Sequence, residues 1–233
     1  MIVDKTIDVE QAFDSFVKSI GGTVLKETLK GDPQFENADY VFHEYGFVAE
    51  LKCLQDNKLD DAAYMSKIDA AWQRWRHAGQ VVGDTPEEIV LQNLPLECQR
   101  ELVDIGETPL KGIVKKANKQ IKVTKQTLNL STYKGVLLVA NDGNFGLPAN
   151  TLWTLIGGLL SRGYTSIDNT VLFSVNMAAR VPGADIPCMV WMLGYRSKAE
   201  SLSEAVLNTI RDGWSKYHET LTDQNYRKFS GNM

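Results

Sequence analysis

The spacing of hydrophobic positions alternates along the chain between the helical and the strand period, and it predicts an α/β protein. Apolar residues recur every three or four positions over residues 9–20, directly after Asp8, whose short carboxylate is suited to cap a helix. Two short runs rich in β-branched and aromatic residues follow at 38–43 and 47–54, separated by a turn, and predict a hairpin. A second helix is expected over residues 62–76, where large apolar side chains again recur in helical steps.

The second half of the chain predicts buried strands with helices between them. Residues 135–140, GVLLVA, form a continuous apolar run typical of a strand covered on both faces. The other expected elements are a long helix that includes residues 111–125, an apolar helix at 147–162, buried strands at 170–175 and 189–193, and a C-terminal helix from Ser203 to about residue 217. The sum is a mixed central β-sheet flanked by helices.

Residues 83–109 interrupt this pattern. Pro86, Pro95 and Pro109 are expected to break the segment into short helical pieces, which we interpret as a helical insertion or lid. A chain of 233 residues is long enough to bury one large core. We therefore expect residues 1–233 to form a single domain that carries this insertion.

The composition is that of a soluble globular protein, with 43% hydrophobic and 23% charged residues and a mean hydropathy of −0.22. The longest apolar stretch, residues 152–160, is shorter than the roughly 20 residues that a membrane-spanning helix needs. Acidic residues close behind Met1 do not match a signal peptide, and three cysteines without a CxxC spacing predict neither a disulfide framework nor a cysteine zinc site. We expect a cytoplasmic protein without a membrane partner.

The charge is distributed unevenly along the chain. The formal net charge is −4, yet residues 108–141 contain seven lysines and no acidic residue. Such local asymmetry is typical of a protein that contacts nucleic-acid phosphates, although a solvated helix face gives the same pattern. The lysines expected to contact a nucleic-acid backbone are Lys111, Lys115, Lys116, Lys119 and Lys122.

Several familiar catalytic motifs are absent from the sequence. It contains no GxxxxGK(S/T), no GxGxxG after a strand and no GxSxG, so phosphate-cradling loops and hydrolase nucleophile elbows have no support. His43 and Glu44 begin like a zinc-protease motif, but Phe47 stands where the second histidine belongs. With three histidines in the chain, any metal is expected to be held by oxygen ligands.

The predicted hairpin carries charged residues where a buried strand is expected. Glu50 and Lys52 lie within the apolar run 47–54, and alternation places them on one face of that strand. Burying these charges costs several kcal/mol per ion unless they are paired or bind something. Asp39, on the other arm, can reach the same end of the hairpin, and two neighbouring carboxylates repel unless a divalent cation lies between them. The alternative is a buried salt bridge between Glu50 and Lys52.

These residues and their order resemble the PD-(D/E)XK nuclease superfamily of restriction enzymes, resolvases and exonucleases. The resemblance covers residues 9–139: a helix, the hairpin with Asp39 and Glu50-Leu51-Lys52, a helix and the strand at 135–140. It implies a restriction-endonuclease-like core and Mg²⁺ or Mn²⁺ held by Asp39, Glu50 and the main-chain carbonyl of Leu51. Lys52 is then expected to orient or help deprotonate the attacking water. The sequence departs from the family motif in having Ala38 where proline is usual.

Two further positions fit the resemblance. Glu10, at the edge of the first helix's apolar face, matches an extra acidic residue that helps hold the metal in many relatives; a glutamate stabilised by the helix dipole is equally compatible. Lys116 and Gln120, one turn apart, look like the helical lysine or glutamine near the scissile phosphate, which places Gln120 among the expected catalytic residues. Plain surface residues are the alternative for both.

The expected function is metal-dependent hydrolysis of phosphodiester bonds by an endonuclease that acts on DNA, in restriction, anti-phage defence or repair. One rival hypothesis is a catalytically silent nucleic-acid-binding or assembly module that keeps the nuclease fold. Another is an unrelated α/β protein whose hairpin charges are only structural. By analogy with nucleases that cut both strands, a homodimer is a further expectation.

Overall fold

The computed structural model describes residues 6–29, 36–83, 93–178, 188–196 and 201–222. Its elements are α1 (Val9–Ser19), β1 (Thr23–Val24), α2 (Leu25–Thr28), β2 (Tyr40–Phe42), β3 (Phe47–Leu54), a 3₁₀ turn η1 (Lys58–Asp60), α3 (Ala62–His77), α4 (Leu96–Thr127), β4 (Lys134–Asn141), α5 (Ala149–Ser161), β5 (Asn169–Ser174), β6 (Trp191–Tyr195) and α6 (Glu204–Thr222). Within these residues, the helices are too short or too polar to cross a lipid bilayer.

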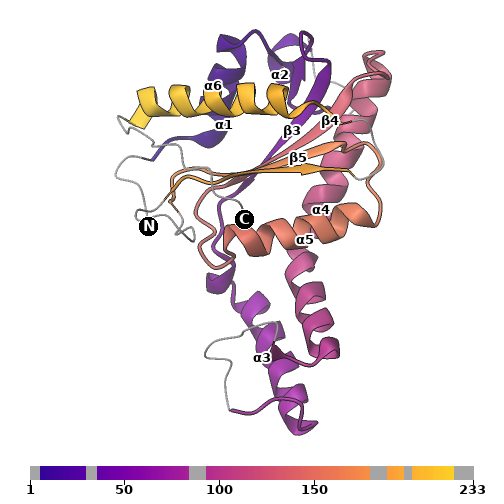
Figure 1. The fold of residues 1–233 in the computed structure, drawn as a ribbon, viewed down its shortest axis with the longest axis vertical. Helices are drawn as coiled ribbons and strands as arrows, with labels where there is room; N and C mark the ends of the chain where they lie inside the picture. Colours follow the sequence, from indigo (N-terminus) through magenta and orange to yellow (C-terminus); the bar gives the residue numbers. More distant parts are fainter. Residues whose placement is uncertain (1–5, 30–35, 84–92, 179–187, 197–200, 223–233) are drawn as a thin grey trace.

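Six strands form one mixed sheet in the order β1-β2-β3-β4-β5-β6 (Figure 1). The first three are antiparallel neighbours, β3, β4 and β5 run parallel, and β6 returns antiparallel at the edge. The parallel pairs require crossovers, which α3 with α4 and then α5 provide. The predicted α/β class with a mixed central sheet is confirmed.

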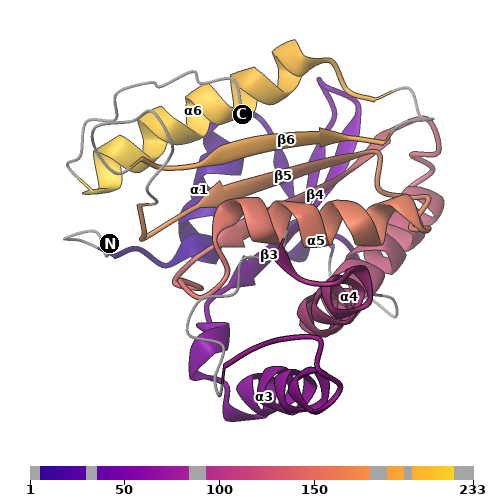
Figure 2. The ribbon, with the colours of Figure 1, turned by 60° about the horizontal axis from the view of Figure 1, so that its bottom comes forward.

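Helices cover both faces of the sheet (Figure 2). On one face, α1 and α6 pack a cluster of aromatic side chains, in which Phe13 makes edge-on or tilted contacts with Phe16, Phe173 and Trp214 at ring-centroid distances of 4.9–5.7 Å. On the other face, the apolar sides of α4 and α5 cover the same strands. The middle strands are therefore buried on both sides, as the apolar run at 135–140 predicts.

The helix α4 corrects the expected break at Pro109. It continues as one helix of 32 residues through this proline, which removes a single backbone hydrogen bond but leaves the packing of the helix intact. Buried Gly106 and Leu110 on either side of Pro109 pack against α5 and the sheet, and this tertiary contact outweighs the local signal. Residues 84–92 of the expected lid, with Pro86, lie outside the described residues.

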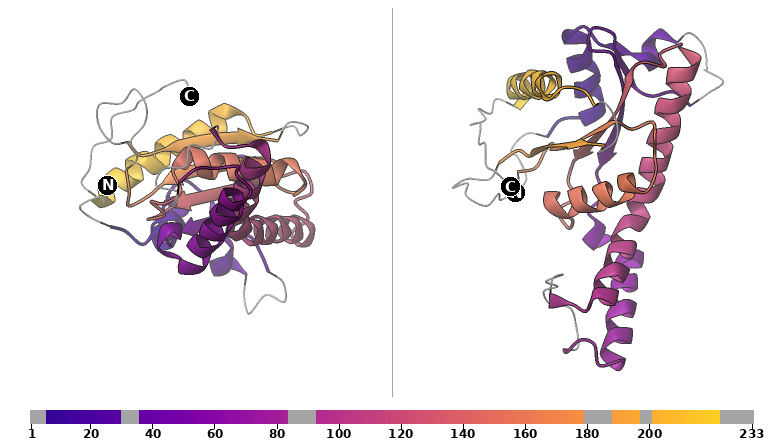
Figure 3. Two further views of the ribbon diagram at one scale, coloured as in Figure 1. Left: turned by 90° about the horizontal axis from the view of Figure 1, so that it is seen from below. Right: turned by 45° about the vertical axis from the view of Figure 1, so that its right-hand side comes forward.

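The first part of α4 and α3 extend away from the sheet as a two-helix arm (Figure 3). Trp72 and Trp75, two of the large apolar residues that recur at 62–76, pack with Ala71 and Cys98 in a small core of their own. The arm is linked to the sheet through the continuous axis of α4. It therefore extends the domain rather than capping the sheet.

The local signals at most element boundaries are confirmed. Asp8 caps α1 by accepting a hydrogen bond from the Gln11 backbone N–H at 2.9 Å. At Gly135, the second residue of β4, a Cβ atom would lie 1.8 Å from the Ser166 carbonyl oxygen, so this close approach of two chain segments needs glycine. The strand expected at 189–193 is displaced to β6, and as an edge strand it is only partly buried.

Candidate active site

A pocket with about 130 Å³ of space opens beside the middle of β3. Residues that are far apart in the sequence meet there, from α1, α2, the β2–β3 hairpin and α4. Its lining consists of Glu10, Asp14, Val24, Lys26, Asp39, Tyr40, Glu50, Leu51, Lys52 and Gln120. Every residue expected from the sequence to catalyse the reaction or hold the metal therefore lines this one pocket.

The backbone of the hairpin brings Asp39 to Leu51. Pairing between β2 and β3 stops at Tyr40 opposite Ala49. One residue before Tyr40, the Asp39 side chain bonds to β3 in place of a backbone carbonyl. Its Oδ2 accepts a hydrogen bond from the Leu51 backbone N–H at 2.8 Å. The N–H and C=O of one residue in a strand point to the same side. The Leu51 carbonyl therefore faces the side on which Asp39 lies.

Glu50 and Lys52 lie on the face of β3 that the alternation predicts. Val48 on that face packs with the α4–α5 core, whereas Ala49 and Leu51 pack with the α1–α6 core. The ammonium of Lys52 contacts Glu50 Oε1 directly, which matches the pairing part of the salt-bridge alternative. The other oxygen, Glu50 Oε2, is buried and has no hydrogen-bond partner within the part of the chain that the structure describes.

Gln120 of α4 fixes the position of Lys52 from the opposite wall. Its Oε1 lies 3.3 Å from Lys52 Nζ, and its Nε2 donates to the Asn37 carbonyl oxygen at 2.9 Å. Only 8% of Gln120 is exposed, so the plain surface interpretation of this residue is wrong. Lys116, one turn earlier, is exposed and does not line the pocket.

Burial dominates the electrostatics of the two carboxylates. It raises the pKa of Glu50 to about 8; the Asp39 carboxylate adds to this shift, and Lys52 opposes it. Burial also raises the pKa of Asp39, against the hydrogen bond from Leu51 and the charge of Lys52. One lysine thus does not compensate two buried carboxylates, and the site favours a further positive charge.

The donor atoms fit a hard divalent cation. Asp39, Glu50 and the Leu51 carbonyl supply oxygen alone, which suits Mg²⁺ or Mn²⁺, and the unpartnered Glu50 Oε2 is an available ligand atom. Within the described residues no three His, Cys, Asp or Glu side chains are grouped closely enough to hold an ion. Glu10 therefore lines the pocket without joining the two carboxylates in such a group, and its role as a ligand stays a prediction.

The sequence did not reveal a second set of polar residues in this pocket. Asp14, one turn after Glu10, accepts a hydrogen bond from the Tyr40 hydroxyl at 3.0 Å and pairs with Lys26 Nζ at 2.5 Å. Asp14 is almost fully buried, whereas Lys26 is about half exposed at the pocket mouth. Asp14 could have been identified from the sequence as an acidic residue on the apolar side of α1. No sequence pattern distinguishes Lys26, which lies on a short helix.

The predicted lysine face is present on α4 near this pocket. Its exposed members are Lys111, Lys115, Lys116, Lys119 and Lys122. Lys119 pairs with Glu36 at 3.3 Å, but both side chains are exposed, so water and salt screen this pair. Lys125 differs, because it is half-buried and lies 4.0 Å from Asp168.

Comparisons with known proteins give no match to a family model, a curated protein or a solved structure. The chemistry assigned to the pocket therefore depends on its own residues.

Proposed function

We propose that this protein is a Mg²⁺- or Mn²⁺-dependent nuclease that hydrolyses phosphodiester bonds in DNA. The observation that carries the proposal is the convergence of Asp39, Glu50, Lys52 and Gln120 on one pocket from elements up to 81 positions apart in the sequence. The order of helix, hairpin, helix and strand, with β3 parallel to β4, also supports a restriction-endonuclease-like core.

In the proposed mechanism, Asp39, Glu50 and the Leu51 carbonyl would hold the cation, whose contribution when bound would be to lower the pKa of a water molecule and to offset charge on the phosphate. Lys52 supplies a positive charge beside the attacking water, and Gln120 keeps its ammonium in place. Lys26, at the mouth of the same pocket, is positioned by Asp14 to contact a phosphate of the substrate. In this mechanism the ion would bind at the hairpin residues Asp39, Glu50 and Leu51, whereas a phosphate of the substrate would bind to Lys26 at the pocket mouth.

The lysine face of α4 supports a nucleic-acid substrate. Five exposed lysines on one helix provide contacts to backbone phosphates without selecting a base sequence. Such contacts release counterions, so binding is expected to weaken steeply as the salt concentration rises.

A cleavage assay tests this function. Supercoiled DNA, linear DNA and RNA are incubated with the wild-type protein and Mg²⁺ or Mn²⁺, beside Lys52→Ala. Cutting of DNA by the wild type and at least a hundredfold slower cutting by the variant is expected, since a positioned charge of this kind contributes roughly that factor. Lys18→Ala, which removes an exposed lysine of α1, is the matched control and keeps full activity. No cleavage of DNA under any condition contradicts the proposal.

A second candidate is a catalytically silent nucleic-acid-binding or assembly module. The direct contact of Lys52 with Glu50 favours it, because that contact occupies one of the carboxylate oxygens that an ion needs. This candidate predicts salt-sensitive binding that EDTA does not change, together with no cleavage. The same assay, with a binding measurement added, distinguishes the two functions.

The nuclease proposal extends to the setting of the protein. We place it in the cytoplasm, in restriction, anti-phage defence or repair, and as a homodimer that cuts both strands. Sedimentation of the protein alone and on a duplex tests the dimer.

A further inference from the structure

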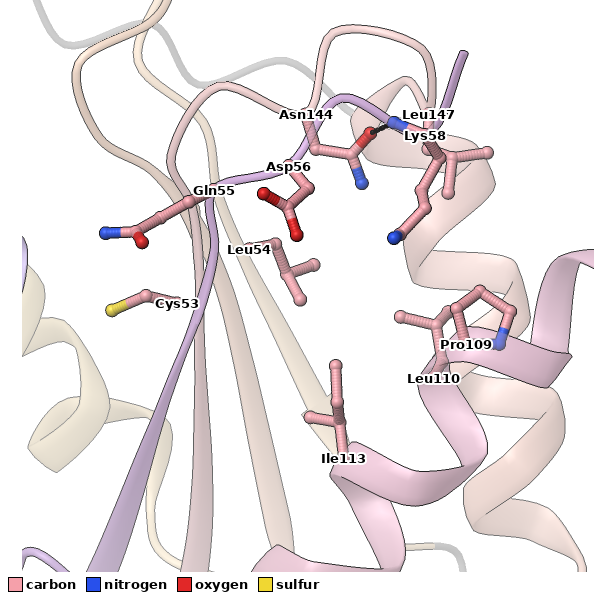
Figure 4. Close-up of a pocket in the computed structure, with 10 residues that line it drawn as sticks. All are labelled: Cys53, Leu54, Gln55, Asp56, Lys58, Pro109, Leu110, Ile113, Asn144 and Leu147. Atoms are coloured by element: carbon pink, nitrogen blue, oxygen red, sulfur yellow. Dashed lines mark hydrogen bonds between the residues drawn. The ribbon is translucent and has the colours of Figure 1, made fainter. Parts of the chain in front are cut away.

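A second pocket lies at the end of β3, with about 140 Å³ of space (Figure 4). Leu54, Leu110 and Ile113 form an apolar floor, and Leu147 lies on the other side of the cavity, beside Asn144 and Lys58. Three polar side chains, Asp56, Lys58 and Asn144, point into the cavity above this floor. An apolar pocket with a few convergent polar groups is the usual form of a site for a small organic ligand.

Asn144 is a fixed part of this pocket. It is only 2% exposed, and its Oδ1 accepts a hydrogen bond from the Lys58 backbone N–H at 3.2 Å. Its own backbone N–H donates to Asn141 Oδ1 at 3.2 Å, which holds the loop in place. The Nδ2 group is aimed into the cavity and has no partner among the described residues (Figure 4). An amide N–H that faces an open cavity is available to donate to an acceptor on a ligand.

Asp56 and Lys58 complete the polar rim. Asp56 is exposed and forms no ion pair with any described residue, although its carboxylate points toward the cavity. The Lys58 ammonium forms a long ion pair with Asp61 Oδ2 at 3.5 Å, and because both side chains are partly exposed its other N–H groups can still donate to a ligand. Around the cavity the order is a carboxylate with two acceptor oxygens, an amide donor and an ammonium donor. This order fits a planar ligand with apolar ring faces whose edge carries two hydrogen-bond donors next to hydrogen-bond acceptors.

The second pocket continues the row of residues that forms the candidate active site. Glu50, Lys52 and Leu54 alternate onto the same face of β3, so Leu54 lies roughly 7 Å beyond Lys52 along the strand, and Asp56 follows in the bend after β3. On α4, Ile113 precedes Gln120 by about two turns, or roughly 10 Å. A substrate strand whose phosphate lies at Lys52 therefore reaches this pocket within a few nucleotides.

We propose that this pocket binds an unpaired guanine base of the substrate strand. The adjacent N1–H and N2–H donors of guanine match the two oxygens of Asp56, and its O6 and N7 acceptors match Asn144 Nδ2 and Lys58 Nζ. The apolar floor covers the ring face, and a cavity of roughly 150 Å³ holds a benzene ring in another protein, so part of the purine lies in the open mouth. The inference rests on the proposed function, since it takes nucleic acid as the ligand.

Guanine satisfies more of these groups than the other bases do. Cytosine and adenine each offer one exocyclic amino group, which leaves one Asp56 oxygen without a donor, and thymine presents a single ring N–H. A base inside a duplex has its edge paired and cannot enter a recess. The proposal therefore includes a preference for single-stranded or frayed nucleic acid near the cleavage site.

The experiment measures binding without cleavage, so its outcome does not depend on catalysis. Fluorescence anisotropy is recorded in EDTA, and again with Ca²⁺, on a thymine oligonucleotide that contains one guanine, inosine, 7-deazaguanine or thymine. Inosine lacks the N2 donor to Asp56, and 7-deazaguanine lacks the N7 acceptor. We expect each to bind roughly tenfold more weakly than guanine.

Two variants and a control test which side chain contacts which hydrogen-bonding group of the base. Asp56→Asn is expected to bind guanine and inosine equally, because it no longer accepts both donors. Asn144→Asp keeps the Oδ1 acceptor for the Lys58 N–H and replaces the Nδ2 donor, so the fold is retained while the preference for guanine is lost. Gln55→Ala is the matched control: its side chain points away from the cavity, and the preference is unchanged (Figure 4).

The two proposals fail in different ways. Equal binding of guanine, inosine and thymine by the wild-type protein overturns the base pocket, even if the protein cleaves DNA. An equal loss of guanine preference in Gln55→Ala and Asp56→Asn overturns it as well. A guanine preference that depends on Asp56 and Asn144 supports the pocket, even if no cleavage occurs and the nuclease proposal fails.

Discussion

Replacing Glu50 by glutamine is expected to remove a large part of the pH dependence of the stability of the metal-free protein. Burial raises the pKa of Glu50 from its ordinary 4.5 to about 8. The folded protein therefore holds this proton more tightly than the unfolded chain does. Between these pH values the folded state binds more protons, so the free energy of unfolding falls as the pH rises. Glu50→Gln carries no titrating group and does not lose this stability.

The size of the effect follows from the same pKa difference. A rise from 4.5 to about 8 corresponds to roughly 5 kcal/mol, since each pKa unit is about 1.4 kcal/mol. This value is an upper limit, because water that enters the pocket and movement of the Lys52 ammonium can both stabilise the ionised form of Glu50. We expect about 2 to 5 kcal/mol of stability to be lost by the wild-type protein between about pH 4.5 and about pH 8, a large share of the stability of a domain.

Urea unfolding in EDTA at a series of pH values measures this difference. The stability of Glu50→Gln minus that of the wild type should grow from pH 5 to pH 8.5. Glu10→Gln, which changes an exposed carboxylate of the same pocket and leaves Glu50 in place, is the matched control and should keep the loss of stability seen in the wild type. If Glu50 and Lys52 instead form a stabilising salt bridge, the sign is opposite: Glu50→Gln becomes relatively less stable as the pH rises, and that result refutes the argument.

Three other variants test separate parts of the account. Gly135→Ala should prevent folding, because the added methyl group lies 1.8 Å from a backbone oxygen; a circular dichroism spectrum and thermal melt like those of the wild type would contradict this. The double variant Lys115→Ala, Lys122→Ala should weaken DNA binding about tenfold and lower the slope of log K against log salt by about 1.5, measured by anisotropy; an unchanged slope excludes the lysine face. Lys26→Met should raise the KM for DNA about threefold to tenfold with a smaller change in kcat, whereas Lys18→Met should change neither.

Much of the fold follows from local patterns in the sequence. Helical and strand periods predict α1, β3, α3, β4, α5 and β5 to within about two residues, because each of these elements is long enough to show its period and packs one clear apolar face. The strand β1, with only Thr23 and Val24, is too short to have a period, and its pairing with β2 exists only in the folded chain. Pro109 misled the prediction because its local cost is outweighed by contacts with residues far away in the sequence.

The residues of the candidate site also divide into those that the sequence predicted and those that it could not predict. Glu50 and Lys52 stand out because charge interrupts an apolar strand, and the helical wheel of α4 placed Gln120 at the edge of its apolar face. By contrast, Lys26 and Tyr40 meet Asp14 through the packing of α1 against the hairpin, and no spacing in the sequence encodes that contact. The second pocket was missed for a similar reason, since Asp56 and Asn144 come from two loops that only the parallel pairing of β3 and β4 brings together.

The most direct test of the account is a calorimetric titration of the metal-free protein with Mn²⁺ at pH 8, beside Asp39→Asn and Glu50→Gln. We predict that the wild type binds Mn²⁺ in the pocket and that each substitution weakens this binding at least tenfold, because each removes a charged oxygen ligand. Absence of Mn²⁺ binding, or equal binding by all three proteins, would show that these two carboxylates do not hold a cation and would contradict the proposed nuclease site.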